Sequence, residues 1–167
     1  REKIGTKLIK KFNIGEEIFL SYSPEREDPG SKVKFKDVTK ISSGYTKNCA
    51  SLSKSVYQKI VKKVVSASSL EEAEMCKLLE NIYRSVNIGL INELKIILRP
   101  MNIDINEVIK LASTKPFGFE TFYPGPGVGG HCIPIDPYYL YWRAKKFGQK
   151  ANFVKLAGDI NIETTHW

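Results

Sequence analysis

One uninterrupted stretch, residues 69–99, constrains the fold of this chain more than any other feature of its sequence. It contains no proline and only one glycine, Gly89, and it opens with Ser69 followed three residues later by Glu72, the pattern of a helix capping box. Apolar side chains recur along it at helical spacing, at Met75, Leu78, Leu79, Ile82, Val86, Leu90, Leu94 and Ile97. At 1.5 Å per residue, roughly 30 residues give one helix about 45 Å long.

The apolar stripe of this helix is longer than one small domain can cover, which predicts self-association. Gly89 has no side chain and so permits a close helix crossing. Because two-fold dimers are the commonest symmetric assemblies, we expect a homodimer that forms through the helix of residues 69–99.

The residues before this helix predict alternating helices and strands. Apolar spacing indicates a helix at 4–12 and a strand at 17–23, and a second β-type stretch follows at 38–45. A helix at 47–63 and a short strand at 64–66 complete this part. The alternation is typical of the tail of an α/β sheet, so we expect an α/β region at 1–68.

The residues after the long helix are expected to be mostly helical. Helices are predicted at 105–113, at 137–147 with Asp136 as the N-cap, and at 153–164. Residues 114–135 form a long connection rich in glycine, proline and aromatic residues, and loops of that length are more often functional than idle. The fold class is therefore mixed α/β and mostly helical, with a helical region at 69–167.

The composition argues against several classes of protein. A net charge of +8 on 167 residues would attract nucleic acids, but the lysines are scattered over the predicted helices and are not interleaved with aromatic residues, so we expect no nucleic acid as a partner. Three separated cysteines and two histidines offer neither a disulfide framework nor the usual metal ligands. Without an apolar run of about 18 residues or a signal peptide, we expect a cytoplasmic protein with no membrane insertion.

The connection contains the most distinctive chemistry, in the sequence GPGVGGHCIPIDPYYL at 125–140. Gly125, Gly127, Gly129 and Gly130 precede Cys132, so backbone N–H groups can approach a ligand closely and can favour the thiolate, the nucleophilic form of cysteine. A buried structural cysteine is the alternative. GPGVGG also satisfies the letters of a dinucleotide-binding motif, but it has a proline inside and a cysteine after it, which argues against an NAD site.

This loop resembles the active-site loop of the UDP-glucose/GDP-mannose dehydrogenase family, and the resemblance extends over nearly the whole chain. Four other segments resemble the family in the same order: SPEREDPG (23–30), AEMCKLLENIYRSVNIGLINELK (73–95), IDINEV (103–108) and TKPFGF (114–119). The wording is most similar to the UDP-N-acetylhexosamine 6-dehydrogenase branch. The resemblance implies the C-terminal edge of a Rossmann-type NAD-binding domain at 1–68, followed by an all-α central dimerisation domain at 69–167.

The resemblance also implies an activity and a covalent mechanism. Members of the family use NAD to oxidise the C6 hydroxyl of a UDP-sugar twice, which yields uronic acids for surface polysaccharides. Cys132 matches the cysteine that captures the aldehyde as a thiohemiacetal and then forms a thioester, and Glu25 matches a general base for thioester hydrolysis. The usual NAD phosphate loop is not in this chain. Pro29 replaces a second glutamate of the glucose-specific branch, which argues against UDP-glucose as the substrate.

Two residues of the long helix and one at the end of the loop match further catalytic positions. Lys77 and Asn81 are four residues apart and share a helix face, and the resemblance implies that they stabilise negative charge on the C6 oxygen. A solvated helix face is the alternative. Asp136 matches an aspartate that handles protons, and its alternative is a simple N-cap.

The resemblance assigns weaker roles to the aromatic residues of the loop. Tyr123 and the glycines from Gly125 to Gly130 would line the substrate site, and Phe117 and Phe119 would reach across a dimer interface, although such aromatics are often packing residues. A different class of function also fits the sequence: a helical dimerisation module that is catalytically inert when isolated.

Overall fold

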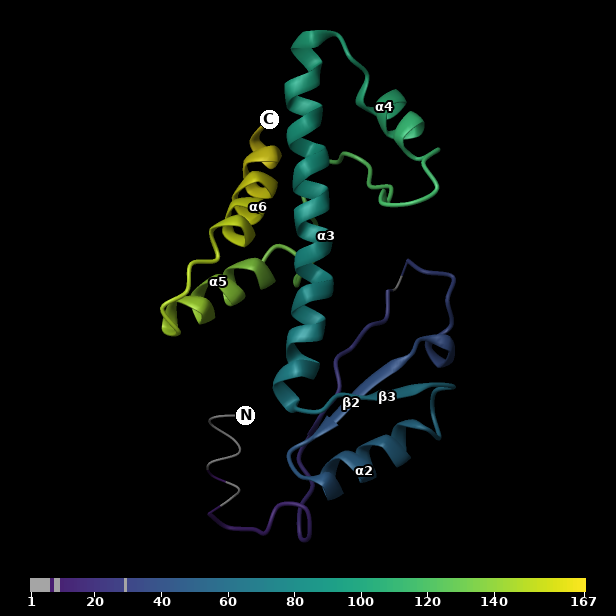
Figure 1. Ribbon diagram of the computed structural model, residues 1–167, viewed down its shortest axis with the longest axis vertical. Helices are drawn as coiled ribbons and strands as arrows, with labels where there is room; N and C mark the ends of the chain where they lie inside the picture. The colour runs from purple at the N-terminus through teal and green to yellow at the C-terminus, as the bar shows by residue number, and fades with distance from the viewer. Residues whose placement is uncertain (1–6, 8–9, 29) are drawn as a thin grey trace. The chain divides into compact units, whose positions relative to one another are not determined.

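The computed structural model describes residues 7, 10–28 and 30–167, and the chain divides into two compact units, Arg1–Lys77 and Leu78–Trp167 (Figure 1). Most of the helix expected at 4–12, and Pro29, lie outside the described residues. The elements, in chain order, are β1 (Ser21–Tyr22), η1 (Phe35–Asp37), β2 (Lys40–Gly44), α2 (Lys47–Tyr57), β3 (Val64–Ser66), α3 (Leu70–Leu98), η2 (Arg99–Met101), α4 (Ile105–Ala112), α5 (Asp136–Lys146), α6 (Asn152–Glu163) and η3 (Thr164–His166).

The first unit is a small α/β arrangement centred on β2. Its three strands have the order β1-β2-β3, with β1 antiparallel and β3 parallel to β2. α2 is the crossover between the two parallel strands and packs against both, as the geometry of a βαβ unit requires (Figure 1). The Thr46 hydroxyl accepts the N–H of Cys49 and so caps α2. The expected mixed α/β, mostly helical fold is confirmed.

Two elements of the first unit are shorter than the sequence predicts. The strand expected at 17–23 is reduced to β1, because Gly15, in a left-handed conformation, turns the chain and donates its N–H to Ile18. The helix expected at 47–63 ends at Tyr57. Beyond it the backbone turns, and the N–H of Lys62 bonds to the carbonyl of Lys36, which directs the chain into β3.

The long helix α3 confirms the central expectation from the sequence and runs for 29 residues. The Ser69 hydroxyl accepts the N–H of Glu72, which is one half of the capping box, whereas the Glu72 carboxylate accepts a hydrogen bond from Ser68. After α3 and the short η2, the chain reverses at Asn102, which adopts a left-handed conformation with φ of 56°.

The core of the second unit forms where α3 meets α4. Ile91 of α3 and Ile105 and Ile109 of α4 are buried together, with Leu94, Leu98 and Phe122 packed against them. The Asp104 carboxylate caps α4 by accepting the N–H of Asn106. The packing of α4 against α3 holds the start of the long connection beside α3.

The last two helices pack against each other, and α6 also contacts α3. The Tyr138 hydroxyl of α5 donates to Asp159 of α6, and the absence of a side chain at Gly158 leaves room for the Tyr138 ring, since a Cβ there would lie 3.0 Å from it. A Cβ at Gly89 would lie 3.3 Å from the carbonyl oxygen of Ala157 in α6. The close crossing expected at Gly89 is therefore made within this chain.

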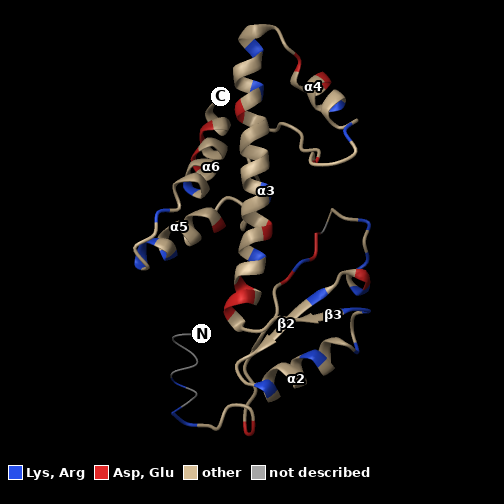
Figure 2. Ribbon diagram, in the orientation of Figure 1, with Lys and Arg blue, Asp and Glu red and all other residues tan. Residues whose placement is uncertain are grey.

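Charged side chains are spread over many elements (Figure 2). The first turn of α3 carries Glu71 and Glu72, and the last turn of α5 carries Arg143, Lys145 and Lys146, which suits the dipole of each helix. Within the described part of the chain, no helix combines the length and the apolar character that crossing a membrane requires.

Candidate active site

Cys132 lies in a turn that leads directly into α5. Its backbone carbonyl accepts the N–H of Ile135 at 3.0 Å and the N–H of Asp136 at 2.8 Å. Its side chain is exposed, which excludes the alternative of a buried structural cysteine. Cys132 thus lies in the turn just before the N-terminal end of α5.

Asp136 connects this turn to α3. We expected Asp136 to be the N-cap of α5, but it is the first residue of the helix, and Ile135 occupies the cap position without any side-chain cap. The Asp136 carboxylate instead accepts a hydrogen bond of 2.6 Å from the Nδ2 of Asn81. The N-cap prediction is wrong because a long-range amide partner holds the carboxylate away from the N–H groups of its own helix.

Lys77 lies one turn before Asn81 on α3, on the same face of the helix, and its side chain is half-buried. Asn81 is buried, with 8% of its surface exposed, so this part of the helix is not the solvated face that the sequence left open. Within the described part of its own unit, Lys77 forms no ion pair.

The glycine loop is attached to the second unit at two points. The N–H of Gly125 donates to the Oδ1 of Asn92 on α3 at 2.9 Å. Gly127 has φ of 115°, and a Cβ there would lie 2.7 Å from Thr165 and 3.0 Å from the carbonyl oxygen of Asn161. Only glycine suits this position, because both its conformation and its close contact with the end of α6 exclude a side chain.

The remaining loop glycines are open. A Cβ at Gly129 or Gly130 would have no neighbour within 4 Å among the described residues, and Gly130 has φ of 90°. The loop is therefore anchored at its start and exposed just before Cys132.

Sequence reasoning missed the polar residues that anchor the loop. Asn92 is completely buried. Ser85 lies on the same face of α3, is 1% exposed and accepts two hydrogen bonds from the Nδ2 of Asn161, one at its carbonyl and one at its hydroxyl. Asn81, Ser85 and Asn92 are separated by four and then seven residues, so they form one polar row along α3. That spacing was the available signal, because a polar row within an apolar helix needs buried partners.

The aromatic residues of the connection lie near a cavity of about 520 Å³ in the second unit, whose lining includes Tyr123, Phe122, Tyr83 and Glu120. The Tyr83 hydroxyl donates to the Glu120 carboxylate at 2.6 Å, and this bond raises the pKa of Tyr83. Tyr123 is 67% exposed. Phe117 is 72% exposed, whereas Phe119 is 38% exposed and lines a second cavity with Tyr83 and Leu90.

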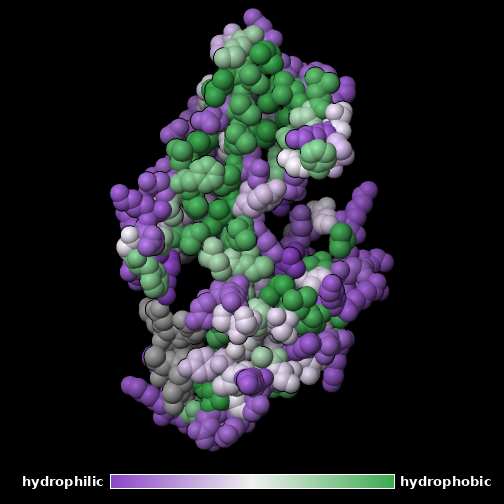
Figure 3. Space-filling model, in the orientation of Figure 1, coloured by the Kyte–Doolittle hydropathy of each residue, from purple (hydrophilic) through white to green (hydrophobic). Residues whose placement is uncertain are grey.

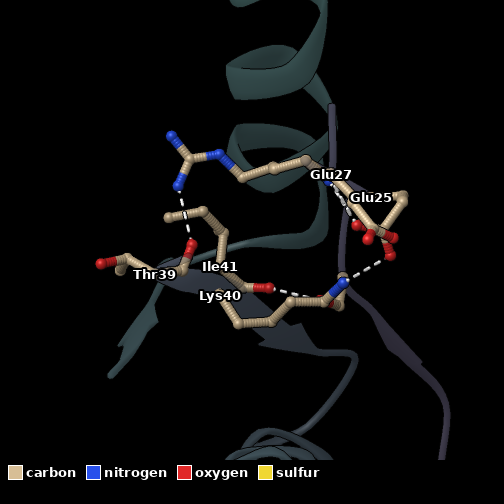
Figure 4. Close-up of polar contacts among 7 residues, drawn as sticks. Glu25, Glu27, Thr39, Lys40 and Ile41 are labelled. Atoms are coloured by element: carbon tan, nitrogen blue, oxygen red, sulfur yellow. Dashed lines mark hydrogen bonds and ion pairs between the residues drawn. The ribbon is translucent and has the colours of Figure 1, made fainter. Parts of the chain in front are cut away.

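Glu25 belongs to the first unit, where three donors hold its carboxylate (Figure 4). Its Oε1 accepts the backbone N–H groups of Arg26 and Glu27, at 2.7 Å and 2.9 Å, and its Oε2 accepts the ammonium of Lys40 at 2.9 Å. The bond from Lys40 is the main reason that the pKa of Glu25 lies below its ordinary value.

The other two cysteines differ from Cys132 in exposure. Cys76 is half-buried in α3, and Cys49 is completely buried in α2. Burial opposes ionisation of Cys49, but hydrogen bonds from the Thr46 hydroxyl and from the N–H of Leu20 outweigh it and lower its pKa. The described residues contain no cluster of three or more His, Cys, Asp or Glu side chains that could hold a metal ion.

Comparison with known proteins identifies the class to which this fold and site belong. Residues 71–163 match the central domain of the UDP-glucose/GDP-mannose dehydrogenase family. This chain belongs to that family.

Individual relatives indicate a narrower branch. The chain is 44% identical over 149 residues to Protein CapL of Staphylococcus aureus, which covers 88% of this chain and 35% of that protein. It is 43% identical over 159 residues to a UDP-N-acetyl-D-glucosamine 6-dehydrogenase of Pseudomonas aeruginosa, which covers 92% of this chain and 37% of that enzyme. The chain therefore spans little more than a third of the length of these relatives.

A solved structure supports the same relationship. The UDP-D-ManNAc dehydrogenase of Pyrococcus horikoshii matches 98% of this chain and 39% of its own, with a TM-score of 0.86 and 33% identity. The likeness extends over both units of this chain.

Proposed function

We propose that this chain is part of an NAD-dependent UDP-sugar 6-dehydrogenase that oxidises the C6 hydroxyl of a UDP-N-acetylhexosamine twice, to the uronate, for surface polysaccharide synthesis. One structural observation carries the proposal. The hydrogen bond from Asn81 to Asp136, and the bond from the Asp136 N–H to the Cys132 carbonyl, join three of the expected catalytic residues in one place.

Cys132 supplies the nucleophile in this proposal. The first oxidation turns the C6 alcohol into an aldehyde, and the thiolate adds to the aldehyde carbon to form a thiohemiacetal. The second oxidation converts the thiohemiacetal into a thioester, and water then cleaves the C–S bond to give the carboxylate and the free thiol. The covalent bond keeps a reactive aldehyde in place between the two oxidations, which is why an exposed thiol is required.

The polar groups beside Cys132 handle charge and protons. Lys77 and Asn81 would stabilise negative charge on the C6 oxygen, with the ammonium contributing most because it carries a full positive charge. Asp136 is oriented by Asn81 and would accept or return the hydroxyl proton. Glu25 would activate the water that cleaves the thioester.

NAD supplies the hydride acceptor for both oxidations. The glycine loop, which is fully described, does not form a pyrophosphate cradle: residues 120–125 contain no strand before the glycines, and the Gly125 N–H is already bonded to Asn92. We assign NAD binding to other parts of the whole protein. Tyr123 and the open glycines, Gly129 and Gly130, would contact the nucleotide sugar.

A homodimer through α3 is the second part of the proposal. The visible face of α3 and α6 is largely apolar (Figure 3), and Leu79, Leu90 and Ile97 of α3 are 60%, 50% and 45% exposed. An apolar patch of this kind marks an interface more often than a free surface. Since α6 fills the crossing at Gly89, the partner would bind α3 on the face that exposes Leu79, Leu90 and Ile97. If the whole protein proves inactive, this association would be its only function.

The test is product formation by the whole protein that carries this chain. With a UDP-N-acetylhexosamine and NAD, we expect two NADH per uronate. Cys132→Ala should abolish uronate formation, whereas Cys76→Ala, the matched cysteine control on α3, should retain it. A Cys132→Ala protein that still makes uronate would rule out the covalent route, and a whole protein without any dehydrogenase activity would leave only the dimerisation module.

A further inference from the structure

Side chains of the segment that carries Glu25 form hydrogen bonds to the backbone at the start of β2. The Ser23 hydroxyl donates to the carbonyl of Ile41 at 2.6 Å, and the Nη1 of Arg26 donates to the carbonyl of Thr39 at 2.8 Å (Figure 4). Pro24, between them, is almost fully buried. The backbone on either side of Glu25 is therefore fixed to the start of the central strand β2.

Lys40 lies on β2 between these two attachment points, and its environment is unusual for a lysine. Only 6% of its side chain is exposed, whereas lysine is among the residues that are rarely buried. Its ammonium lies 5.4 Å from the ring centroid of Phe35 and 5.5 Å from that of Tyr57. Both rings are close enough for a cation–π contact, which compensates part of the lost hydration.

The remaining compensation comes from Glu25. A buried ammonium needs a counter-charge, and the Oε2 of Glu25 provides one at 2.9 Å. The two partners differ sharply in exposure, because the Glu25 side chain is 62% exposed. The ion pair thus has one end anchored in the first unit and the other end facing solvent.

The hydrogen bonds of Glu25 leave it able to bind one more group. A carboxylate offers about four acceptor sites. Three are filled, by the N–H groups of Arg26 and Glu27 and by the Lys40 ammonium. Because 62% of the Glu25 side chain is exposed, the fourth site can accept a hydrogen bond from a water molecule.

We propose that Lys40 is a positioning residue for Glu25: its buried ammonium keeps the carboxylate ionised and in a single orientation for the step in which water cleaves the thioester. This inference rests on the function proposed above for Glu25. A purely structural ion pair would stabilise the first unit without affecting that step.

Two substitutions separate the charge of Lys40 from its bulk. Lys40→Met keeps an unbranched side chain beside the two rings and removes the charge, and the Glu25 carboxylate that loses its partner is 62% exposed, so it is not left as a buried unpaired charge. Lys40→Arg keeps the charge. Lys62→Met is the matched control, since Lys62 pairs with Asp37 on the surface of the same unit and is 69% exposed.

The first measurement is an NMR titration of the Glu25 carboxyl in this chain. Lys40→Met should raise the pKa of Glu25 toward its ordinary value, and Lys40→Arg and Lys62→Met should leave it low. The backbone N–H groups of Arg26 and Glu27, which also bond to this carboxylate, are present in all three variants. An unchanged Glu25 titration in Lys40→Met would overturn the proposal.

The second measurement follows decay of the Cys132 thioester in the whole protein by quenching and mass spectrometry. Lys40→Met should slow hydrolysis on the order of tenfold, as expected when a reacting group loses its orientation, and should move the acid limb of the rate to higher pH, with both effects reversed in Lys40→Arg. Glu25→Gln tests the underlying function separately: if it leaves hydrolysis unchanged, Glu25 is not the base. If Glu25→Gln slows hydrolysis and Lys40→Met lowers only the melting temperature, Lys40 is structural and the inference fails.

Discussion

The two units hold their candidate catalytic groups by different means. In the first unit, Glu25 is fixed by its own neighbours and by Lys40, 15 residues away on the adjacent strand. In the second unit, the loop before Cys132 has no strand ladder, and side-chain amides attach it to the long helix instead. Asn92 holds Gly125 from 33 residues away, and Asn81 holds Asp136 from 55 residues away. The start of the central strand fixes a carboxylate and leaves one of its acceptor sites open, whereas a helix with a polar row anchors a loop and leaves the end of that loop exposed.

The largest expected effect separates the cysteines of the two units. Cys49 has hydrogen-bond donors that favour its thiolate but no exposed surface, and Cys132 is exposed. Iodoacetamide followed by peptide mapping should label Cys132 on the order of a thousandfold faster, because Cys49 requires local unfolding first. Cys76 should react at an intermediate rate. If Cys49 reacts as fast as Cys132, the first unit is far less firmly closed than the structure shows.

The second prediction concerns the charge beside the polar row. In the whole protein, Lys77→Ala should lower turnover by about a hundredfold with little change in KM, because the ammonium is needed when the oxygen becomes anionic. Lys95→Ala is the control, since Lys95 lies further along α3 against the Trp167 ring. Steady-state kinetics decide the matter: a raised KM at normal turnover would make Lys77 a substrate-binding residue.

The third prediction tests the anchor of the glycine loop. Asn92→Leu preserves volume but leaves the Gly125 N–H without its acceptor, so the free energy of unfolding should fall by about 1–3 kcal/mol. Cys132 should also be labelled faster as the loop loosens. Asn87→Leu is the control, because the Asn87 amide bonds only to the Tyr83 carbonyl of its own helix. Equal losses in both variants, measured by urea unfolding, would show that the loop is held by other contacts.

The smallest expected effect lies between α5 and α6. Burial, followed by the hydrogen bond to Asp159, raises the pKa of Tyr138 from its ordinary value of 10 to about 12. Because the pKa is lower in the unfolded state, Tyr138 loses its proton there first as the pH rises. The stabilisation of the folded state by the Tyr138 hydroxyl is therefore complete below pH 10 and disappears between pH 10 and 12. Tyr138→Phe should lower stability by less than about 1 kcal/mol at neutral pH, and it should flatten the alkaline decline. Thermal unfolding across this range gives the comparison. An equally steep decline in Tyr138→Phe would assign the alkaline loss to other groups.

Local sequence signals determined much of this protein. Helical spacing without a breaker produced α3, and Ser69 with Glu72 marked its start to within one residue. The ends of α4 and α6 fall within one residue of the expected positions, because caps and apolar spacing act over only a few residues. The family segments located Cys132, Asn81 and Asp136, and the structure brings these three together.

Tertiary contacts decided what those local signals could not. α2 ends at Tyr57 although its helical pattern continues, because the chain must turn back to pair β3 with β2. The Asp136 carboxylate accepts a hydrogen bond from Asn81 and does not cap its own helix, and α6 of the same chain packs against α3 at Gly89. Lys40 lies outside the family segments, Asn92 was given no role within its segment, and the contacts of both depend on partners distant in the sequence. For Lys40 and Asn92 the physical reason is that a buried polar or charged group needs a partner, and for α2 and Gly89 it is that chain reversal and close packing involve distant segments; only the folded arrangement determines which partner is within reach.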